Sequence, residues 1–322
     1  MTVMVTGAAG LIGTELCKQL LAHGETVVAL DNFYTGSAAN LAQFRGRNNF
    51  YFIQRDVTDN LLNSIGDGYE WPQPMGMFDP LKQIYNLACP ASPVHYQTDP
   101  WYTLMTNIDG VRNMLNISKQ AGARMLQAST SEVYGDPLKH PQEETYWGNV
   151  NTLGPRACYD EGKRVAETMC NISSADTCIA RIFNTYGPYM SLTDGRAVSN
   201  FITQALQNEP LTMHGDGSQT RSFCYVSDTA TALRRLMNSG HAGPINIGNP
   251  DEVTLLQLAE EIIELTGSSS EIVYQDSAVD DPNRRKPEVL LASQVLRWCP
   301  TVDRRLGLIY TIEYIKEQLC KQ

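Results

Sequence analysis

Tyr159 and Lys163 are the two residues whose types and spacing point most directly to chemistry. Side chains four residues apart lie on one face of a helix, which makes one turn in about 3.6 residues. A lysine ammonium beside a phenol favours the phenolate, and so does a cationic nicotinamide nearby. Such a tyrosine takes the proton of a substrate hydroxyl while hydride leaves the same carbon. The pair therefore predicts alcohol oxidation; the alternative is a solvated helix face, on which this spacing is common.

Thr130 closes the segment that begins with the apolar run 125–128, which is typical of a buried strand. Open α/β sheets bind their ligands at the carboxyl ends of their strands. We therefore expect the Thr130 hydroxyl to hold the same substrate hydroxyl that Tyr159 deprotonates.

The start of the chain has the pattern of a dinucleotide-binding unit. A short apolar run at 2–6 is followed by a helical pattern, and the turn between them carries Gly7, Gly10 and Gly13. These glycines allow a tight turn and a close approach to a pyrophosphate, while the helix N-terminus offers free N–H groups. A second predicted strand, 26–30, leads into Asp31, whose carboxylate suits the hydroxyls of an adenosine ribose and repels a 2′-phosphate. NAD is therefore expected rather than NADP.

Strands and helices alternate through residue 185. Further strands are expected at 49–53, 83–88 and 177–182, one helix at 100–121, and another that carries Tyr159 and runs to about residue 171; 60–80 is expected to be a surface loop. This alternation predicts an α/β fold with a Rossmann-type, doubly wound parallel sheet. We assign residues 1–185 to an NAD-binding domain, to which 222–250 return. Residues 186–221 and 251–322 form a smaller, sequence-discontinuous substrate domain in this prediction.

The composition argues against several kinds of partner. The formal net charge is −10 and no Lys/Arg cluster occurs, whereas nucleic acids require basic surfaces. No apolar stretch approaches about 18 residues, and the chain opens on a predicted strand instead of a leader, so we expect a cytoplasmic protein without a membrane segment. The five histidines and eight cysteines lack ligand spacing, so no metal site is predicted.

Four arginines near predicted turns are candidates for binding the phosphates of a ligand, because guanidinium groups bind phosphate bidentately. They are Arg196, Arg221, Arg284 and Arg285. The alternative is that they are ordinary surface arginines.

Across nearly its whole length the chain resembles the extended short-chain dehydrogenase/reductases, and within them the UDP-glucuronate decarboxylases. The motifs that carry the resemblance are TGAAGLIG at 6–13, DNFYTG at 31–36, LACPASP at 87–93, STSEVYGDP at 129–137, YWGNVN at 146–151, CYDEGKRVAE at 158–167, ARIFNTYGP at 180–188, DGR at 194–196 with VSNF at 198–201, QTRSFCYV at 219–226 and RKP at 285–287. The glycine motif is shared by many families, and the later strings are far more specific.

The resemblance implies a redox-neutral decarboxylation of UDP-glucuronate to UDP-xylose. NAD oxidises C4, the resulting β-keto acid loses carbon dioxide, C5 is protonated and the hydride returns to C4. The residues matched to catalytic positions are Thr130, Ser131, Glu132, Tyr159, Lys163 and Arg285. By this resemblance Tyr159 is the base, Glu132 lies near C5 and Arg285 assists decarboxylation or the later protonation.

Binding residues are carried over in the same way. For NAD they are Gly7, Gly10, Leu11, Ile12, Gly13, Asp31, Asn32, Phe33, Thr35, Gly36, Asp56, Val57, Leu87, Ala88, Tyr159 and Lys163. For the UDP-sugar they are Pro90, Tyr96, Asn184, Arg196, Val198, Gln219, Arg221, Tyr225 and Arg285. The resemblance also implies a homodimer in which the helix at 100–121 and the Tyr159 helix pair with their copies. The membrane-anchored members of the family carry an N-terminal extension, so the cytosol is the expectation here.

Other reactions are compatible with parts of this set. Sugar-nucleotide 4,6-dehydratases carry an acidic residue where this chain has Ser131, whose hydroxyl is a poor acid, so dehydration is disfavoured. A 4-epimerase has no need of Glu132 with Arg285. Release of a 4-keto pentose and a silent NAD-binding protein remain alternatives. Three residues depart from the family pattern, namely Met105 in place of lysine, Thr152 in place of proline and Tyr189 in place of arginine.

Overall fold

The computed structural model describes residues 1–59, 81–277, 280 and 282–321. The surface loop predicted at 60–80 lies outside the described residues. Within these ranges no helix is both long and apolar enough to cross a membrane.

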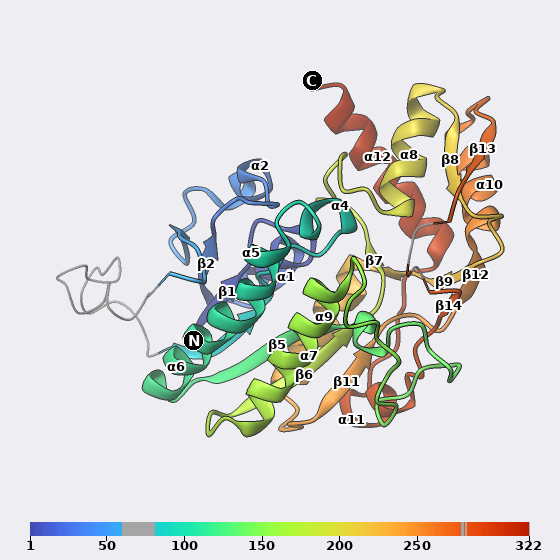
Figure 1. Ribbon diagram of the computed structural model, residues 1–322. Helices are drawn as coiled ribbons and strands as arrows, with labels where there is room; N and C mark the ends of the chain where they lie inside the picture. The colour runs from blue at the N-terminus through green and yellow to red at the C-terminus, as the bar shows by residue number, and fades with distance from the viewer. Residues whose placement is uncertain (60–80, 278–279, 281, 322) are drawn as a thin grey trace.

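A seven-stranded sheet forms the centre of the molecule, with the strand order β11-β6-β5-β4-β1-β2-β3 (Figure 1). Its strands are β1 (Thr2–Thr6), β2 (Thr26–Asp31), β3 (Phe50–Gln54), β4 (Leu81–Asn86), β5 (Arg124–Thr130), β6 (Thr177–Ile182) and β11 (Pro244–Ile247). All neighbouring pairs are parallel. The order reverses between β1 and β4, and such a reversal opens a crevice at the carboxyl ends of the strands. The predicted doubly wound parallel sheet is confirmed.

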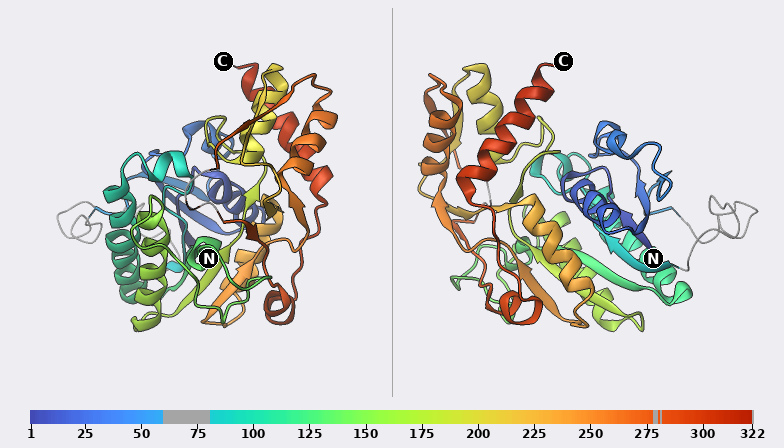
Figure 2. Two further views of the ribbon diagram at one scale, coloured as in Figure 1. Left: turned by 45° about the vertical axis from the view of Figure 1, so that its right-hand side comes forward. Right: turned by 180° about the vertical axis from the view of Figure 1, so that it is seen from behind.

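Helices cover both faces of this sheet (Figures 1 and 2). One face carries α5 (Pro100–Met105), α6 (Val111–Ala121) and α7 (Ala157–Ile172), and the other carries α1 (Leu11–Ala22), α9 (Val226–Met237) and α11 (Leu290–Leu296). Successive side chains of a strand point to opposite sides, so Val3 and Val5 enter one core and Met4 enters the other. Because helices bury both faces of the sheet, the apolar runs of its strands are nearly continuous in the sequence.

The helix predicted at 100–121 is not uniform. Between α5 and α6 the chain forms a π-helical turn, Thr106–Gly110. The wider turn brings Asn107 towards α7, where a Cβ added to Gly162 would lie 3.1 Å from Asn107 Nδ2. Asn107 Nδ2 also donates to Thr103 O at 2.9 Å and to Cys89 Sγ at 3.2 Å. Apolar spacing alone does not reveal such a turn, because the apolar face continues through it.

A second core lies beyond the carboxyl edge of the sheet, at the upper right of Figure 1. It is built on α8 (Ala197–Gln207), α10 (Leu255–Thr266), α12 (Arg304–Leu319), β8 (Leu211–His214), β13 (Ile272–Gln275), β9 (Thr220–Ser222), β12 (Glu252–Thr254) and β14 (Arg284–Arg285). The remaining short elements are α2 (Ala38–Leu41), η1 (Ala42–Phe44), α4 (Pro93–Tyr96), η3 (Ser131–Tyr134), β7 (Thr185–Tyr186) and β10 (Cys224–Tyr225). Thr254 and Gln257 form a reciprocal capping box that fixes the start of α10.

Candidate active site

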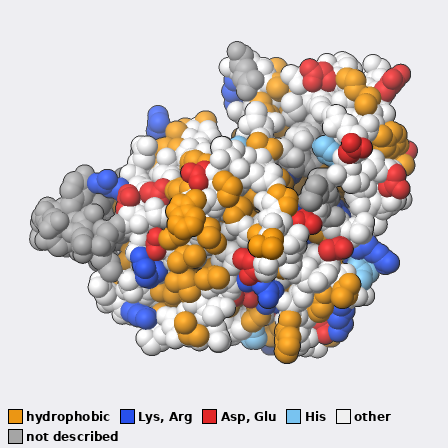
Figure 3. Space-filling view, viewed as in Figure 1, with side chains coloured by type: hydrophobic (Ala, Val, Ile, Leu, Met, Phe, Trp, Pro, Cys, Tyr) orange, Lys and Arg blue, Asp and Glu red, His pale blue; other side chains and the backbone are white. Residues whose placement is uncertain are grey.

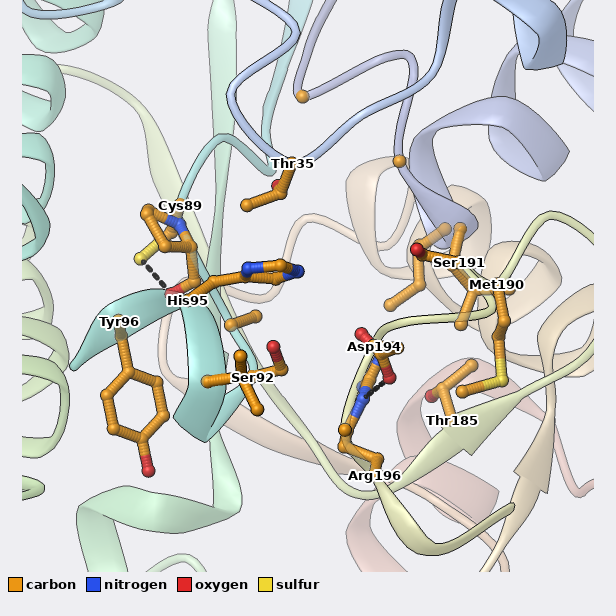
Figure 4. A pocket seen from close by; sticks show the side chains of 18 of the residues that line it. Thr35, Cys89, Ser92, His95, Tyr96, Thr185, Met190, Ser191, Asp194 and Arg196 are labelled. Carbon is orange, nitrogen blue, oxygen red and sulfur yellow. Dashed lines mark hydrogen bonds and ion pairs between the residues drawn. The ribbon is translucent and has the colours of Figure 1, made fainter. Parts of the chain in front are cut away.

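A cavity of about 1120 Å³ lies between the carboxyl ends of the strands and the second core. It exceeds the roughly 300–1,000 Å³ of common small-ligand pockets, so it has room for two large ligands. Figure 4 shows its two walls, with Ser92, His95 and Tyr96 on one side and Asp194 and Arg196 facing them. Arg196 pairs with Asp194, Nη2 to Oδ1 at 3.1 Å.

Nearly all the residues predicted from the sequence line this cavity. From the sheet side these are Gly7, Gly10, Leu11, Ile12, Gly13, Asp31, Asn32, Thr35, Gly36, Asp56, Val57, Leu87, Ala88, Pro90, Tyr96, Thr130, Ser131, Glu132, Tyr159, Lys163 and Asn184. From the second core they are Arg196, Val198, Gln219, Arg221 and Arg285.

Three predicted residues are not brought to the cavity. The Phe33 ring packs on Phe52, with the ring centroids 5.1 Å apart, and its backbone N–H donates to Asp31 Oδ1 at 2.8 Å. The Tyr225 ring packs on Tyr186, with centroids 5.7 Å apart. Arg284 is exposed, because the next residue of β14, Arg285, is the one that faces inward.

The turn between β1 and α1 has the shape that a pyrophosphate requires. Gly7 has a φ of +66°, and a Cβ added to Gly13 would lie 2.1 Å from Gly7 O. Gly10 caps α1 without a side-chain hydrogen bond. The first N–H groups of a helix have no partner within it, so they are available to an anion here.

Asp31 holds this turn in place from the end of β2. Its carboxylate accepts the backbone N–H of Ala9 at 2.9 Å and that of Phe33 at 2.8 Å. Burial is the main cause that raises the pKa of Asp31 above its ordinary value, and the two amides act in the opposite direction. A carboxylate has further lone pairs for ribose hydroxyls. These residues fit an adenine dinucleotide without a 2′-phosphate.

Tyr159 lines the cavity and stacks on Tyr96, with the ring centroids 5.0 Å apart. Lys163 Nζ lies 5.7 Å from the Tyr159 ring centroid and donates to Ala128 O at 2.9 Å. Burial raises the pKa of Tyr159 well above its ordinary value, and a hydrogen bond with Thr130 lowers it. The expected proximity of Thr130, Tyr159 and Lys163 is present. The phenolate expected from Lys163 alone is not favoured, because burial outweighs the groups of the protein that lower this pKa.

Glu132 is clamped between two guanidinium groups beside Tyr159. Arg285 Nη1 contacts one carboxylate oxygen and Arg156 Nη2 contacts the other. Burial works against the charged form, but Arg285 and then Arg156 lower the pKa of Glu132 to about 2. All three side chains line the cavity. Glu132 is therefore ionised at neutral pH, and the cluster presents both signs of charge to a ligand.

Comparison with known proteins agrees with this geometry. Residues 3–248 match the model of the NAD dependent epimerase/dehydratase family. UDP-glucuronic acid decarboxylase 6 of Arabidopsis thaliana is 50% identical over 313 residues, which are 96% of this chain and 87% of the relative. UDP-glucuronic acid decarboxylase 1 of Xenopus tropicalis is 48% identical over 321 residues, 98% of this chain and 72% of the relative. The chain belongs to the UDP-glucuronic acid decarboxylase family.

A solved structure extends the comparison within the wider family. The UDP-glucuronic acid 4-epimerase of Bacillus cereus, in complex with UDP-glucuronic acid and NAD, is 27% identical with a TM-score of 0.86. The alignment covers 99% of this chain and 100% of the epimerase. Enzymes of one fold thus carry out different reactions on the same nucleotide sugar. The residues around the sugar must therefore determine whether it is decarboxylated or epimerised.

Arg156 and Asp160 were missed by the sequence analysis. Arg156 precedes α7 and contacts Glu132, and Asp160 lies next to Tyr159 with a buried carboxyl group. A helix N-terminus carries partial positive charge and favours acidic residues. An arginine in that position, beside the predicted reactive tyrosine, was a signal that could have identified Arg156 as part of this decarboxylase-family site.

Of the three departures from the family pattern, only Tyr189 lines the cavity. Its φ is +78°, its hydroxyl donates to Gln43 Oε1 at 3.3 Å, and its ring packs edge-on against Tyr314 at 5.6 Å. Met105 is half-buried in α5 and Thr152 is exposed. Tyr189 is therefore the departure that can change how this family member holds its ligands.

Gly13→Ala tests the dinucleotide half of the site. The new methyl group meets the Gly7 carbonyl, which is backbone and cannot rotate away, so the turn must deform. We expect NAD affinity to fall by roughly 100-fold and stability by about 1–3 kcal/mol, which calorimetric titration and thermal unfolding measure. Gly243→Ala, whose Cβ would meet only the His241 side chain at 3.3 Å, is the matched control. Equal NAD affinity in both variants would contradict the assignment.

Proposed function

We propose that this protein converts UDP-glucuronate to UDP-xylose and carbon dioxide. The observation that carries the proposal is the Glu132 carboxylate held by Arg156 and Arg285 next to Tyr159 and Lys163. Bound NAD supplies the hydride acceptor and donor for C4 and a positive charge that favours the Tyr159 phenolate. The chain itself supplies the proton transfer, the orientation of the sugar and the charge around its carboxylate.

Tyr159 takes the proton of the 4-hydroxyl and returns it at the end of the cycle. Thr130, hydrogen-bonded to Tyr159, orients that hydroxyl. A ketone at C4 is β to the C6 carboxylate, so carbon dioxide leaves while the electron pair of its bond passes into an enolate. The enolate then takes a proton from solvent at C5, before the hydride returns to C4. Arg285 and Arg156 offer guanidinium groups to the carboxylate. Glu132 shares both cations, so the substrate meets a reduced positive charge.

The second core holds the nucleotide in this proposal, and the sheet unit holds NAD. Arg196, Arg221 and Arg285 approach the cavity from the second core and its connections, where they suit a diphosphate and a carboxylate. From this separation of the cores we infer the domain division at 1–185 with 222–250, and 186–221 with 251–322. The exception within 251–322 is α11, whose Ala292 and Leu296 pack in the core of the sheet unit.

Proton NMR of the purified protein with UDP-glucuronate and a trace of NAD tests the function. UDP-xylose in large excess over the NAD supplied is the expected result. A 4-keto pentose formed only in step with the reduced cofactor would instead identify an oxidative decarboxylase. A carboxylated product with C4 inverted would identify an epimerase, and absence of any reaction with nucleotide sugars would identify a binding protein.

We also infer a homodimer through the outer surfaces of α5 and α7. Figure 3 shows hydrophobic side chains gathered over these helices. Trp101 is 72% exposed on α5, and Ile172 is 75% exposed at the end of α7. Large apolar side chains that gather on one face are typical of protein interfaces.

A double substitution, Trp101→Glu with Ile172→Glu, is expected to convert the dimer to a monomer, because it places charge in an apolar contact. Light scattering measures the mass. Leu290→Glu is the matched control, since Leu290 is 58% exposed on α11, at the opposite face of the sheet. A monomer in the unaltered protein would contradict the inference.

A further inference from the structure

Asp160 is a buried carboxyl group that the proposed chemistry does not use. It is 6% exposed and belongs to the first turn of α7, next to Tyr159. Its Oδ2 lies 4.0 Å from Arg156 Nε, and its Oδ1 has no hydrogen-bond partner among the described residues. It is not one of the residues that line the cavity. Asp160 therefore lies behind the cavity wall, where it can act on a ligand through Arg156.

The groups that face Asp160 come from several elements. They are Glu132 of η3, Arg156 before α7, Arg285 of β14, Tyr96 of α4, and Cys158 and Glu161 of α7. Among the groups that both face Asp160 and line the cavity, Arg156 and Arg285 are positive and Glu132 is negative. The net charge of these three groups together with Asp160 is +1 when Asp160 is protonated and zero when Asp160 is ionised.

Burial, and then the negative charge of Glu132, raise the pKa of Asp160 to about 7, while Arg156 and Arg285 act in the opposite direction. The protonated form is therefore favoured below neutral pH and the carboxylate above it. An acidic residue in the first turn of a helix is often only a partner of the helix dipole. Such a residue would accept hydrogen bonds from the free N–H groups of the first turn, whereas Asp160 Oδ1 accepts none from the described part of the chain.

We propose that Asp160 is a positioning residue that sets the charge of the Arg156–Glu132–Arg285 cluster and thereby favours the carboxylated substrate over the decarboxylated product. The inference rests on the proposed function, because it assigns the cluster to the sugar carboxylate. When Asp160 is protonated, the cluster attracts a carboxylate. After carbon dioxide has left, the sugar of UDP-xylose carries no carboxylate for the cluster to hold, so the sugar of the product gains nothing from the protonated form.

The linkage between proton binding and ligand binding predicts how the affinity changes with pH. A ligand that binds better to the protonated form must raise the pKa of Asp160 and take up protons when it binds. We expect the affinity of the NAD-loaded protein for UDP-glucuronate to fall about tenfold between about pH 6 and about pH 8.5. At about pH 7.5, binding should take up roughly half a proton, measured by calorimetry in buffers of different ionisation enthalpy. UDP-glucose and UDP-xylose should show neither effect, since their sugars are neutral.

Asp160→Asn keeps the shape of the side chain and removes its ionisation. The variant should bind UDP-glucuronate at high pH as tightly as at low pH, with no proton uptake. Glu161→Gln is the matched control, since Glu161 is the adjacent acid and pairs with Arg164 at 3.6 Å. This variant should keep the pH dependence and the proton uptake, with the midpoint moved to slightly lower pH, because the charge of Glu161 helps to raise the pKa of Asp160.

These binding measurements test the role of Asp160 and the proposed function separately. If UDP-glucuronate binds no better than UDP-glucose at about pH 6, the assignment of the cluster to a carboxylate fails. If it binds better but Asp160→Asn keeps the pH dependence and the proton uptake, Asp160 is only structural and the inference is overturned. Proton uptake in the unaltered protein provides a test even if the variant does not fold, because its absence also overturns the inference.

Discussion

Tyr159→Phe is expected to lower the rate of C4 oxidation by roughly 10²- to 10⁴-fold, because it removes the group that accepts the proton. The ring itself remains, so the stack on Tyr96 and the bond from Lys163 Nζ to Ala128 O are kept. NAD should bind as before. Single-turnover absorbance of the nicotinamide measures the oxidation, and calorimetric titration measures NAD affinity.

Tyr134→Phe is a suitable control for this result. The Tyr134 hydroxyl donates to Asn246 Oδ1 at 2.7 Å in a buried position, and Tyr134 does not line the cavity. Its loss should reduce stability by about 1 kcal/mol and leave turnover nearly unchanged. Near-normal turnover of Tyr159→Phe would show that another group takes the proton, whereas equal losses in both variants would indicate a structural effect.

Arg285→Ala is expected to have the second large effect, on carbon dioxide release more than on C4 oxidation. Arg285 is 3% exposed and shares the carboxylate of Glu132 with Arg156. Without it the cluster loses one positive charge, and the pKa of Glu132 rises because its largest stabilising cation is gone. We expect decarboxylation to slow by roughly 10²-fold, as for the loss of one preorganised charge in a closed site.

Rapid quench with labelled carboxylate measures carbon dioxide release, and nicotinamide absorbance measures oxidation in the same mixture. Arg284→Ala is the neighbouring control, because Arg284 is exposed and lies away from the cavity. Equal slowing of both steps by Arg285→Ala would instead make Arg285 a clamp for the diphosphate.

Local patterns were sufficient to predict the sheet and the dinucleotide half of the site. Gly7, Gly13 and Asp31 belong to one continuous strand, turn, helix and strand, so their spacing in the sequence already fixes their geometry. The same holds for Tyr159 and Lys163, which lie on one helix. These predictions depend on contacts between near neighbours in the chain.

Contacts between distant segments were harder to predict. The clamp on Glu132 joins η3, the start of α7 and β14, and its arginines are separated by more than a hundred residues of chain. Its position near a predicted turn made Arg285 one of four candidates for binding phosphates, and only the resemblance gave it a catalytic role. Nothing in the apolar spacing pointed to Arg156 or Asp160. Tyr225 was misplaced for a similar reason, because its ring turns into the packing with Tyr186 instead of the cavity.

The second core has a practical consequence, because the chain enters and leaves it more than once. Its residues come from segments on both sides of α9 and β11, which belong to the sheet unit. No single truncation point can therefore release it as an autonomous fragment, and a proteolytic cut in one crossover would leave both parts associated. Ligands seated between the two cores contact both, so we expect them to merge the melting of the two cores into one cooperative transition in scanning calorimetry.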